Sequence, residues 1–305
     1  MSPDGRFIVS IGSDETANLW SQDGKLVSVM AVPKSFRADV EFSPNNQVFA
    51  TAIDGVVELW NTKGERLHAL IGHTSEVTDV TFSPDGKVLA SAGKDGTIKL
   101  WTSNAELLYD LGEGNGAYNH IAFSPDGQTF IAGNDDGTIQ IWSIEGQLLQ
   151  WLEGHEDKVR RVLFSPDGEM IASGGDDSTV RLWDTKGNLL HKLADHEGPT
   201  LDFTFSPDGQ AIATAGRNEP TIKIWSRDGE LLQTVVGHQD WVLHLKFSPD
   251  GKTLASSSSD NTAILWDLEA LEFDALMQQG CEWWREYTEY QDTPPDPQRE
   301  ICEDI

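Results

Sequence analysis

The chain of 305 residues has few cysteines, few basic residues and no long hydrophobic run. Its two cysteines, Cys281 and Cys302, both lie near the C-terminus, so disulfides cannot hold the rest of the chain together. We expect free thiols, as in an intracellular protein, although the two could also form one disulfide. No apolar stretch approaches the ~18 residues that a membrane-spanning helix needs, so we expect a cytoplasmic protein that does not bind membranes.

Basic residues are scarce relative to acidic ones: 22 Lys and Arg face 50 Asp and Glu, for a net charge of −28. Residues 267–305 hold 12 of the acids and two of the bases. Proteins that bind nucleic acid usually carry a basic stripe, and the sequence has none, so we expect no nucleic-acid partner. The acidity either keeps the protein soluble or attracts a basic partner.

The chain also lacks the signatures of common catalytic and cofactor sites. It contains no G-x-x-x-x-G-K-[ST] phosphate loop, no G-x-S-x-G motif and no kinase-type loop. Its Asp-Gly pairs do not fit a calcium loop that ends in Glu, and they suit hairpin turns instead. We therefore expect no catalytic residue, no cofactor and no metal site.

What the sequence does contain is a sevenfold repeat. A turn motif, most often Phe-Ser-Pro-Asp-Gly, recurs with its serine at Ser2, Ser43, Ser83, Ser124, Ser165, Ser206 and Ser248. A tryptophan keeps the same period, at Trp20, Trp60, Trp101, Trp142, Trp183, Trp225 and Trp266. Both markers are 40 to 42 residues apart, which indicates seven structural units.

Residues 72–111 show what one unit builds. The segment VTDVTF alternates apolar and polar residues, as a half-buried strand does, and the SPDG turn follows it. The segments KVLASAG, TIKLW and ELLYDL supply three more short strands separated by turn residues. Because no helical period intervenes, we predict antiparallel four-stranded sheets, and seven of them can bury their faces around a ring.

The repeat resembles that of WD-repeat (WD40) β-propellers over residues 1–267. The resemblance rests on Gly-His pairs, on SPDG, and on unit endings such as DGTIKLW, with the Trp-Asp pair kept at Trp183-Asp184 and Trp266-Asp267. It implies an all-β, seven-bladed propeller of four-stranded antiparallel blades. Residues 268–305 break the repeat and are predicted to form a short α-helical, acidic tail.

In this family a buried hydrogen-bond set joins one His, Ser or Thr, Asp and Trp within a blade. The matching positions are His73, Ser91, Asp95 and Trp101; His155, Ser173, Asp177 and Trp183; and His238, Ser256, Asp260 and Trp266. These residues are therefore expected to be structural. Pro33 and Gly114 stand where His is expected, and an insertion near Asn218 disturbs the Asp position, so we expect those blades to depend more on packing.

The two ends of the repeat array look incomplete. The first unit begins at its SPDG turn, so the first blade is predicted to lack its inner strand, and the last unit shows no plain outer strand. Our hypothesis is that the chain is the C-terminal part of a longer polypeptide. A substitute strand from the tail, or an intact protein with an open ring, are the alternatives.

The resemblance also implies a binding face, because the family's top face carries side chains three and five positions after the repeat His. At these positions, apolar residues differ from unit to unit, which ring architecture does not require. We predict a partner-binding site centred on Trp241, with Phe36, Leu243 and Leu201 around it and Lys158 and Arg160 as a basic flank. The alternative is that some of these side chains turn inward.

Three functions follow from these features. The first is a non-catalytic protein–protein interaction scaffold, monomeric in its propeller, that binds a protein or peptide. The second is the sensor end of a larger signalling ATPase or kinase, because the tail is similar to the Gly-Cys-x-Trp ending of large bacterial WD-repeat signalling proteins. The third is a propeller enzyme or small-ligand binder, for which the sequence shows no converging polar groups.

Overall fold

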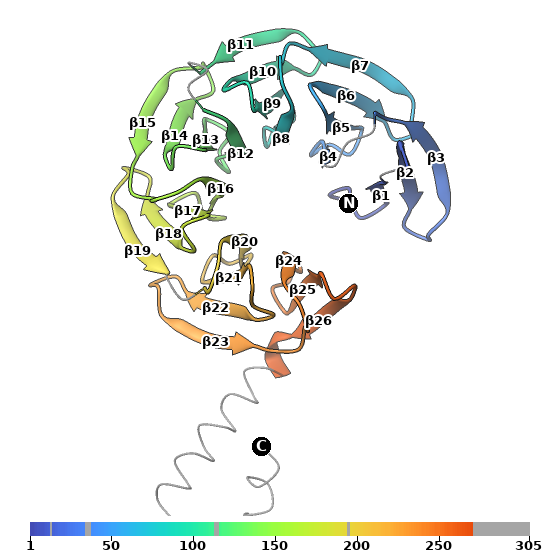
Figure 1. Cartoon of the computed structure of the whole chain (residues 1–305). Helices are drawn as coiled ribbons and strands as arrows, with labels where there is room; N and C mark the ends of the chain where they lie inside the picture. The colour runs from blue at the N-terminus through green and yellow to red at the C-terminus, as the bar shows by residue number, and fades with distance from the viewer. Residues whose placement is uncertain (13, 34–37, 113–115, 194–195, 271–305) are drawn as a thin grey trace, which may run out of the picture.

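Seven antiparallel β-sheets make up the fold. The computed structural model describes residues 1–12, 14–33, 38–112, 116–193 and 196–270. Figure 1 shows the sheets arranged around a central axis, with β4, β8, β12, β16, β20 and β24 closest to it. The predicted seven-bladed propeller is thus confirmed. Residues 268–270 are helical, and the rest of the predicted helical tail, with both cysteines, lies outside the described residues.

The strands follow one another around the ring in chain order. Sheet by sheet they are β1 (Phe7–Ile11), β2 (Thr16–Ser21) and β3 (Leu26–Ala31); β4 (Ala38–Phe42), β5 (Val48–Ile53), β6 (Val56–Asn61) and β7 (Arg66–Ile71); β8 (Val77–Phe82), β9 (Val88–Gly93), β10 (Ile98–Thr102) and β11 (Leu107–Leu111); β12 (Tyr118–Phe123), β13 (Thr129–Asn134), β14 (Ile139–Ser143) and β15 (Leu148–Leu152); β16 (Val159–Phe164), β17 (Met170–Gly175), β18 (Val180–Asp184) and β19 (Leu189–Leu193); β20 (Thr200–Phe205), β21 (Ala211–Gly216), β22 (Ile222–Ser226) and β23 (Leu231–Val235); and β24 (Val242–Phe247), β25 (Thr253–Ser258) and β26 (Ala263–Asp267).

The SPDG turn links the inner strand to the next strand by a fixed set of hydrogen bonds. In the third sheet, the Ser83 hydroxyl donates to Asp85 Oδ1 (2.7 Å) and accepts from the Val88 N–H (3.0 Å). The Gly86 N–H donates to the Ser83 carbonyl, and Gly86 has a φ of 69°, which glycine adopts without steric cost. The turn sequence therefore sets the register of the two inner strands.

Neighbouring sheets pack through apolar side chains that alternate along the strands. Between the fifth and sixth sheets, Leu182 and Phe203 are fully buried and Trp225 is nearly so. Burial of such large side chains removes about 150–250 Å² of each aromatic residue from water. A separate core of this kind fills each junction between consecutive sheets, so the fold is a series of interfaces and not one central core.

The two terminal sheets have three described strands each. In the first sheet β1 follows an SPDG turn, as β9 and β13 do, so the missing strand is the inner one, as predicted. In the last sheet the order is β24-β25-β26, and the position of an outer strand falls outside the described residues.

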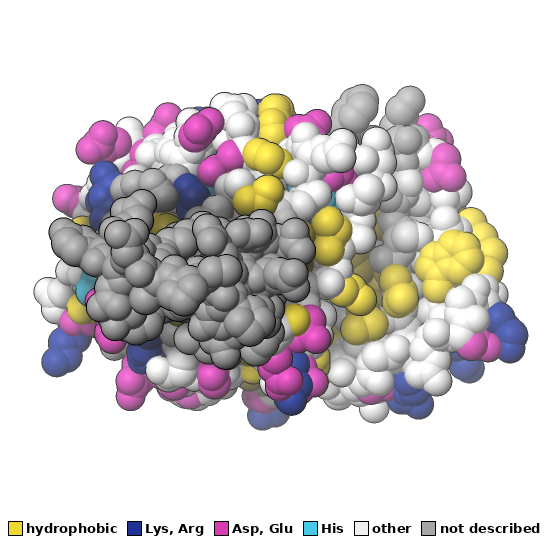
Figure 2. Space-filling model, turned by 90° about the horizontal axis from the view of Figure 1, so that it is seen from below, with side chains coloured by type: hydrophobic (Ala, Val, Ile, Leu, Met, Phe, Trp, Pro, Cys, Tyr) yellow, Lys and Arg dark blue, Asp and Glu magenta, His cyan; other side chains and the backbone are white. Residues whose placement is uncertain are grey.

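Among the described residues, the ring is open between the last sheet and the first (Figure 1). Ile8 on β1 is 43% exposed and Leu265 on β26 is 75% exposed, whereas the residues at the same repeat positions in the sheets between them are buried. Figure 2 views this side of the molecule and shows hydrophobic side chains on its surface, with acidic side chains along both rims. Apolar faces of the first and last sheets are therefore in contact with solvent.

Candidate functional site

A buried hydrogen-bond set joins the loops of the fifth sheet to its second and third strands. His155 Nδ1 lies 2.9 Å from Asp177 Oδ2, and His155 Nε2 lies 2.7 Å from the Ser173 hydroxyl on β17. The Trp183 indole N–H on β18 donates to the same hydroxyl at 2.8 Å. Burial alone would raise the pKa of Asp177, but the hydrogen bond and the electrostatic interaction with His155 lower that pKa well below its usual range. The carboxylate is thus held in its charged form.

The third and seventh sheets repeat this arrangement. His73 contacts Asp95 Oδ2 (3.0 Å) and Ser91 (2.8 Å), and Trp101 donates to Ser91 (3.0 Å). The other set consists of His238 with Asp260 Oδ2 (3.0 Å) and Ser256 (2.7 Å), and Trp266 with Ser256 (2.8 Å). All twelve residues predicted for these sets therefore lie together, four in each sheet, and they join strands and loops within the sheet.

The sixth sheet also has a complete set, so the expectation that packing replaces it there is wrong. His196 Nδ1 makes a short contact with Glu219, and its Nε2 lies 2.7 Å from Thr214 Oγ1. Trp225 donates to the same hydroxyl at 2.8 Å. One residue is inserted before Glu219, and the extra methylene of Glu over Asp spans the added distance.

The fourth sheet uses a different pair around its repeat tryptophan. Gln140 Oε1 accepts hydrogen bonds from the Tyr118 hydroxyl (2.7 Å) and from the Trp142 indole N–H (3.0 Å). The pair forms within β12 and β14 and leaves the indole N–H with a partner, although Ser or Thr is absent. The family pattern of His, Ser or Thr, Asp and Trp has no counterpart of this arrangement, and the strand register brings the three residues together.

At the end of the sheets opposite the SPDG turns, Trp241 contacts Arg217. Arg217 is not among the binding residues predicted from the sequence. Arg217 follows β21, and its guanidinium carbon lies 4.8 Å from the centroid of the Trp241 ring, which precedes β24. The backbone fixes both positions, since Arg217 N–H donates to the Pro199 carbonyl (2.8 Å) and Ser259 N–H donates to the Trp241 carbonyl (2.9 Å). Trp241 is half-buried.

The other predicted binding residues have varied surroundings. Leu243 is 37% exposed and Leu201 is half-buried, and both are the second residue of inner strands in neighbouring sheets. Phe36 lies outside the described residues. The structure therefore places Leu201 and Leu243 at equivalent positions of the sixth and seventh sheets, and Trp241 directly before one of them.

The two predicted basic residues are paired with carboxylates. Lys158 Nζ lies 2.6 Å from Asp135 Oδ2 of the preceding sheet. Arg160 makes a bidentate contact with Asp176, at 2.9 Å from Nε to Oδ1 and 2.5 Å from Nη2 to Oδ2. This flank is a mixed-charge surface, because each positive charge has a negative partner.

A second group of ionisable residues lines the inner strands and was not anticipated from the sequence. The group has one member at the same register position in each of six inner strands: Asp39, Asp79, His120, Arg161, Asp202 and His244. Arg161 Nε lies 2.9 Å from Asp202 Oδ1, and His120 Nδ1 lies 3.5 Å from Asp79 Oδ2. The carboxylates accept backbone N–H groups of the following sheet, as Leu245 N–H donates to Asp202 at 2.8 Å.

Among the residues that the structure describes, no three His, Cys, Asp or Glu side chains are placed to hold a metal ion. Within the same ranges, no helix combines the length and the hydropathy of a membrane-spanning helix.

Comparison with protein families matches five segments of the chain to the family described as WD domain, G-beta repeat. The segments are residues 64–102, 106–143, 146–184, 187–226 and 229–267, and together they cover more than half of the chain. From 106 onward, each segment joins the outer strand of one sheet to the first three strands of the next. A comparison with curated proteins gives no match. The chain therefore belongs to the WD40 repeat family, whose propellers are typically non-catalytic and generally act as scaffolds for protein interactions.

Proposed function

We propose that this chain is a protein-interaction scaffold whose partner binds at the face that carries Trp241. The observation that carries the proposal is the stacking of Arg217 on the Trp241 ring, 4.8 Å from its centroid. Trp and Arg are the residue types most enriched among side chains that dominate binding energy at protein interfaces. Ring architecture does not explain this pair, because other repeats have different residues at both positions.

The surroundings of the pair suit a protein or peptide ligand. Stacking holds the Arg217 guanidinium in place, so its edge N–H groups need less ordering when they bind a carboxylate or carbonyl of a partner. Among the described residues no carboxylate forms an ion pair with Arg217, unlike Lys158 and Arg160. Leu243 and Leu201 add apolar surface next to the stack, which is the composition expected at the centre of an interface.

The test is partner capture with three versions of the protein. Immobilised wild type, Trp241→Ala and Trp151→Ala are exposed to lysate of the source cells, and bound proteins are quantified by mass spectrometry. Trp151 is the matched control, since it is 46% exposed and lies on the outer strand β15, away from the proposed site. We expect Trp241→Ala to capture at least tenfold less of a specific partner than wild type does, and Trp151→Ala to capture as much of it as wild type.

Equal capture by all three proteins would contradict the proposed site. The folded state is checked by thermal unfolding, which Trp241→Ala is expected to change little because Trp241 is only half-buried. The alternative function, a regulatory end of a larger signalling ATPase or kinase, would use the same surface. It requires a phosphate-binding loop elsewhere in the full reading frame.

A further inference from the structure

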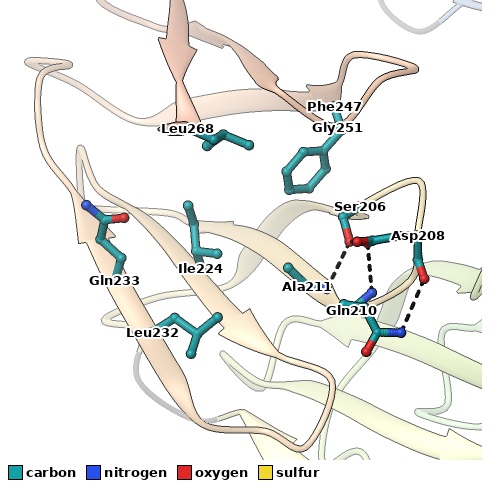
Figure 3. A pocket seen from close by; sticks show the side chains of 10 residues that line it. All are labelled: Ser206, Asp208, Gln210, Ala211, Ile224, Leu232, Gln233, Phe247, Gly251 and Leu268. Carbon is teal, nitrogen blue, oxygen red and sulfur yellow. Dashed lines mark hydrogen bonds between the residues drawn. The ribbon is translucent and has the colours of Figure 1, made fainter. Parts of the chain in front are cut away.

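A pocket lies between the sixth and seventh sheets at the end that carries the SPDG turns (Figure 3). Its volume is about 530 Å³, within the ~300–1,000 Å³ range of ligand sites. Ile224, Leu232, Phe247 and Leu268 form its apolar wall. At the other side Ser206, Asp208 and Gln210 form a polar end, as Figure 3 shows. The pocket is thus apolar along most of its wall and acidic at one end.

The neighbouring junction shows which side chains fill this kind of space. Between the fifth and sixth sheets, Arg227 Nη1 lies 2.6 Å from Asp167 Oδ2, and Nη2 lies 3.2 Å from Glu169 Oε2. Arg227 Nη1 also approaches the Gly209 carbonyl at 3.5 Å. Met170 is buried in the apolar core of the same junction. An arginine and a methionine of the chain itself therefore occupy this junction.

The pocket exists because the next repeat lacks both side chains. Arg227 stands two residues after its repeat tryptophan, and the same position in the last repeat is Leu268. Met170 stands five residues after its repeat serine, where the following repeat has Ala211, which lines the pocket. Ala211 is shorter than Met170 and Leu268 is shorter than Arg227, so the side chains of the described residues leave this space unfilled.

The groups that bind the Arg227 guanidinium have counterparts in the pocket. Asp208, Gln210 and Gly251 occupy the repeat positions of Asp167, Glu169 and Gly209, and all three line the pocket. Asp208 Oδ1 accepts hydrogen bonds from the Ser206 hydroxyl (2.6 Å) and the Gln210 N–H (3.0 Å). These hydrogen bonds lower the pKa of Asp208, so it is a carboxylate at neutral pH.

We propose that this pocket binds an arginine side chain, together with an adjacent apolar side chain, of a protein partner. The arginine would contact the Asp208 carboxylate as Arg227 contacts Asp167, and the apolar group would take the volume that Met170 fills next door. Charge complementarity supports a basic partner, because the chain carries a net charge of −28. This site is separate from the Trp241 surface, since the two lie at opposite ends of β24.

The test uses two fluorescein-labelled hexapeptides, Gly-Ser-Arg-Met-Gly-Ser and the same peptide with citrulline in place of arginine. Citrulline keeps the shape of arginine but has no charge, so the pair isolates the contact with Asp208. We expect the full chain to bind the arginine peptide at least tenfold more tightly, as measured by fluorescence polarisation. Asp208→Asn should reduce the affinity for the arginine peptide to the citrulline level, because it removes the charge without changing the volume.

Filling the pocket from within gives a second, independent variant. The double substitution Ala211→Met, Leu268→Arg copies the junction of the fifth and sixth sheets, and we expect it to weaken peptide binding at least tenfold. Thr253→Met, at the position of Ala211 in the last sheet, is the matched control and should bind like wild type, because it lies on the open side of that sheet and does not line the pocket. Trp241→Ala should also bind like wild type, which separates this proposal from the proposed function.

Two results would overturn the proposal. Equal affinity of the full chain for both peptides would assign the pocket to a neutral apolar ligand. Absence of binding by either peptide would show that the pocket is not a site for this side-chain chemistry.

Discussion

Asp79 in the third sheet accepts a hydrogen bond from the backbone N–H of Ile121 in the fourth sheet, at 2.7 Å. The same carboxyl group contacts Asp39 of the second sheet, so Asp79 connects three consecutive sheets. Burial, and then the nearby negative charge of Asp39, raise the pKa of Asp79 well above its usual value of 3.8. The protonated form can donate to Asp39 while it still accepts from Ile121.

The first prediction is that Asp79→Asn makes the protein more stable at high pH. A carboxyl whose pKa is raised on folding stabilises the fold fully below its unfolded pKa, and this stability is lost as pH rises through the folded pKa. Asn has the hydrogen-bonding pattern of the protonated acid and does not ionise. We expect a higher melting temperature than wild type at pH 8, and a difference that shrinks as pH falls towards 4.

Asp202→Asn is the matched control, because Asp202 holds the same position in the sixth sheet but pairs with Arg161 at 2.9 Å. Loss of that pair should cost about 1–3 kcal/mol at pH 8, opposite in sign to Asp79→Asn. The same sign for both variants would contradict this account.

A second prediction concerns the shared hydroxyl of the buried set in the fifth sheet. Ser173→Ala removes the partner of both His155 Nε2 and the Trp183 indole N–H, which have almost no contact with water. Two unsatisfied buried groups should lower the free energy of unfolding by about 2–4 kcal/mol in urea titrations. Ser10→Ala removes the equivalent bond to Trp20, where water has access, and should cost less than about 1 kcal/mol.

The third prediction compares two leucines at the same repeat position. Leu182 is fully buried between the fifth and sixth sheets, whereas Leu265 faces the open side of the last sheet. Leu182→Ala should lower the free energy of unfolding by about 2–5 kcal/mol because it leaves a cavity. Leu265→Ala should change it by less than about 0.5 kcal/mol. A large loss with Leu265→Ala would mean that its face is covered in solution.

The fourth prediction tests the length of the Glu219 side chain. Glu219→Asp keeps the charge but shortens the reach to His196, across a turn that is one residue longer than in the other sheets. Loss of this buried hydrogen bond should cost about 1–3 kcal/mol in the free energy of unfolding. A variant that combines Glu219→Asp with deletion of Asn218 restores the turn length of the other repeats, and we expect it to recover part of the loss. No recovery would show that reach is not the reason for Glu.

The structural features that lie within one repeat could be predicted from the sequence. The seven sheets, the missing inner strand before β1 and the grouping of His155 with Ser173 and Trp183 all follow from positions that recur every 40 to 42 residues. Each of these features lies within one repeat, so comparison of the repeats was enough to find it.

Features that arise between repeats were not predicted. The Arg217–Trp241 stack, the Lys158–Asp135 pair and the Asp79–Ile121 bond each join residues of two different sheets. Which positions meet across a junction depends on the spacing and twist of neighbouring sheets, which the repeat pattern does not reveal.

The opening between the last sheet and the first has a consequence for how the molecule unfolds. In a closed ring every sheet packs against a neighbour on both sides, but here the terminal sheets each have one described neighbour (Figure 1). Stability in such an array is close to a sum of nearest-neighbour terms, as in a linear chain of coupled units. The protein should therefore fray from both ends, so amide hydrogens of β1–β3 and β24–β26 exchange first and those of the fourth sheet exchange last.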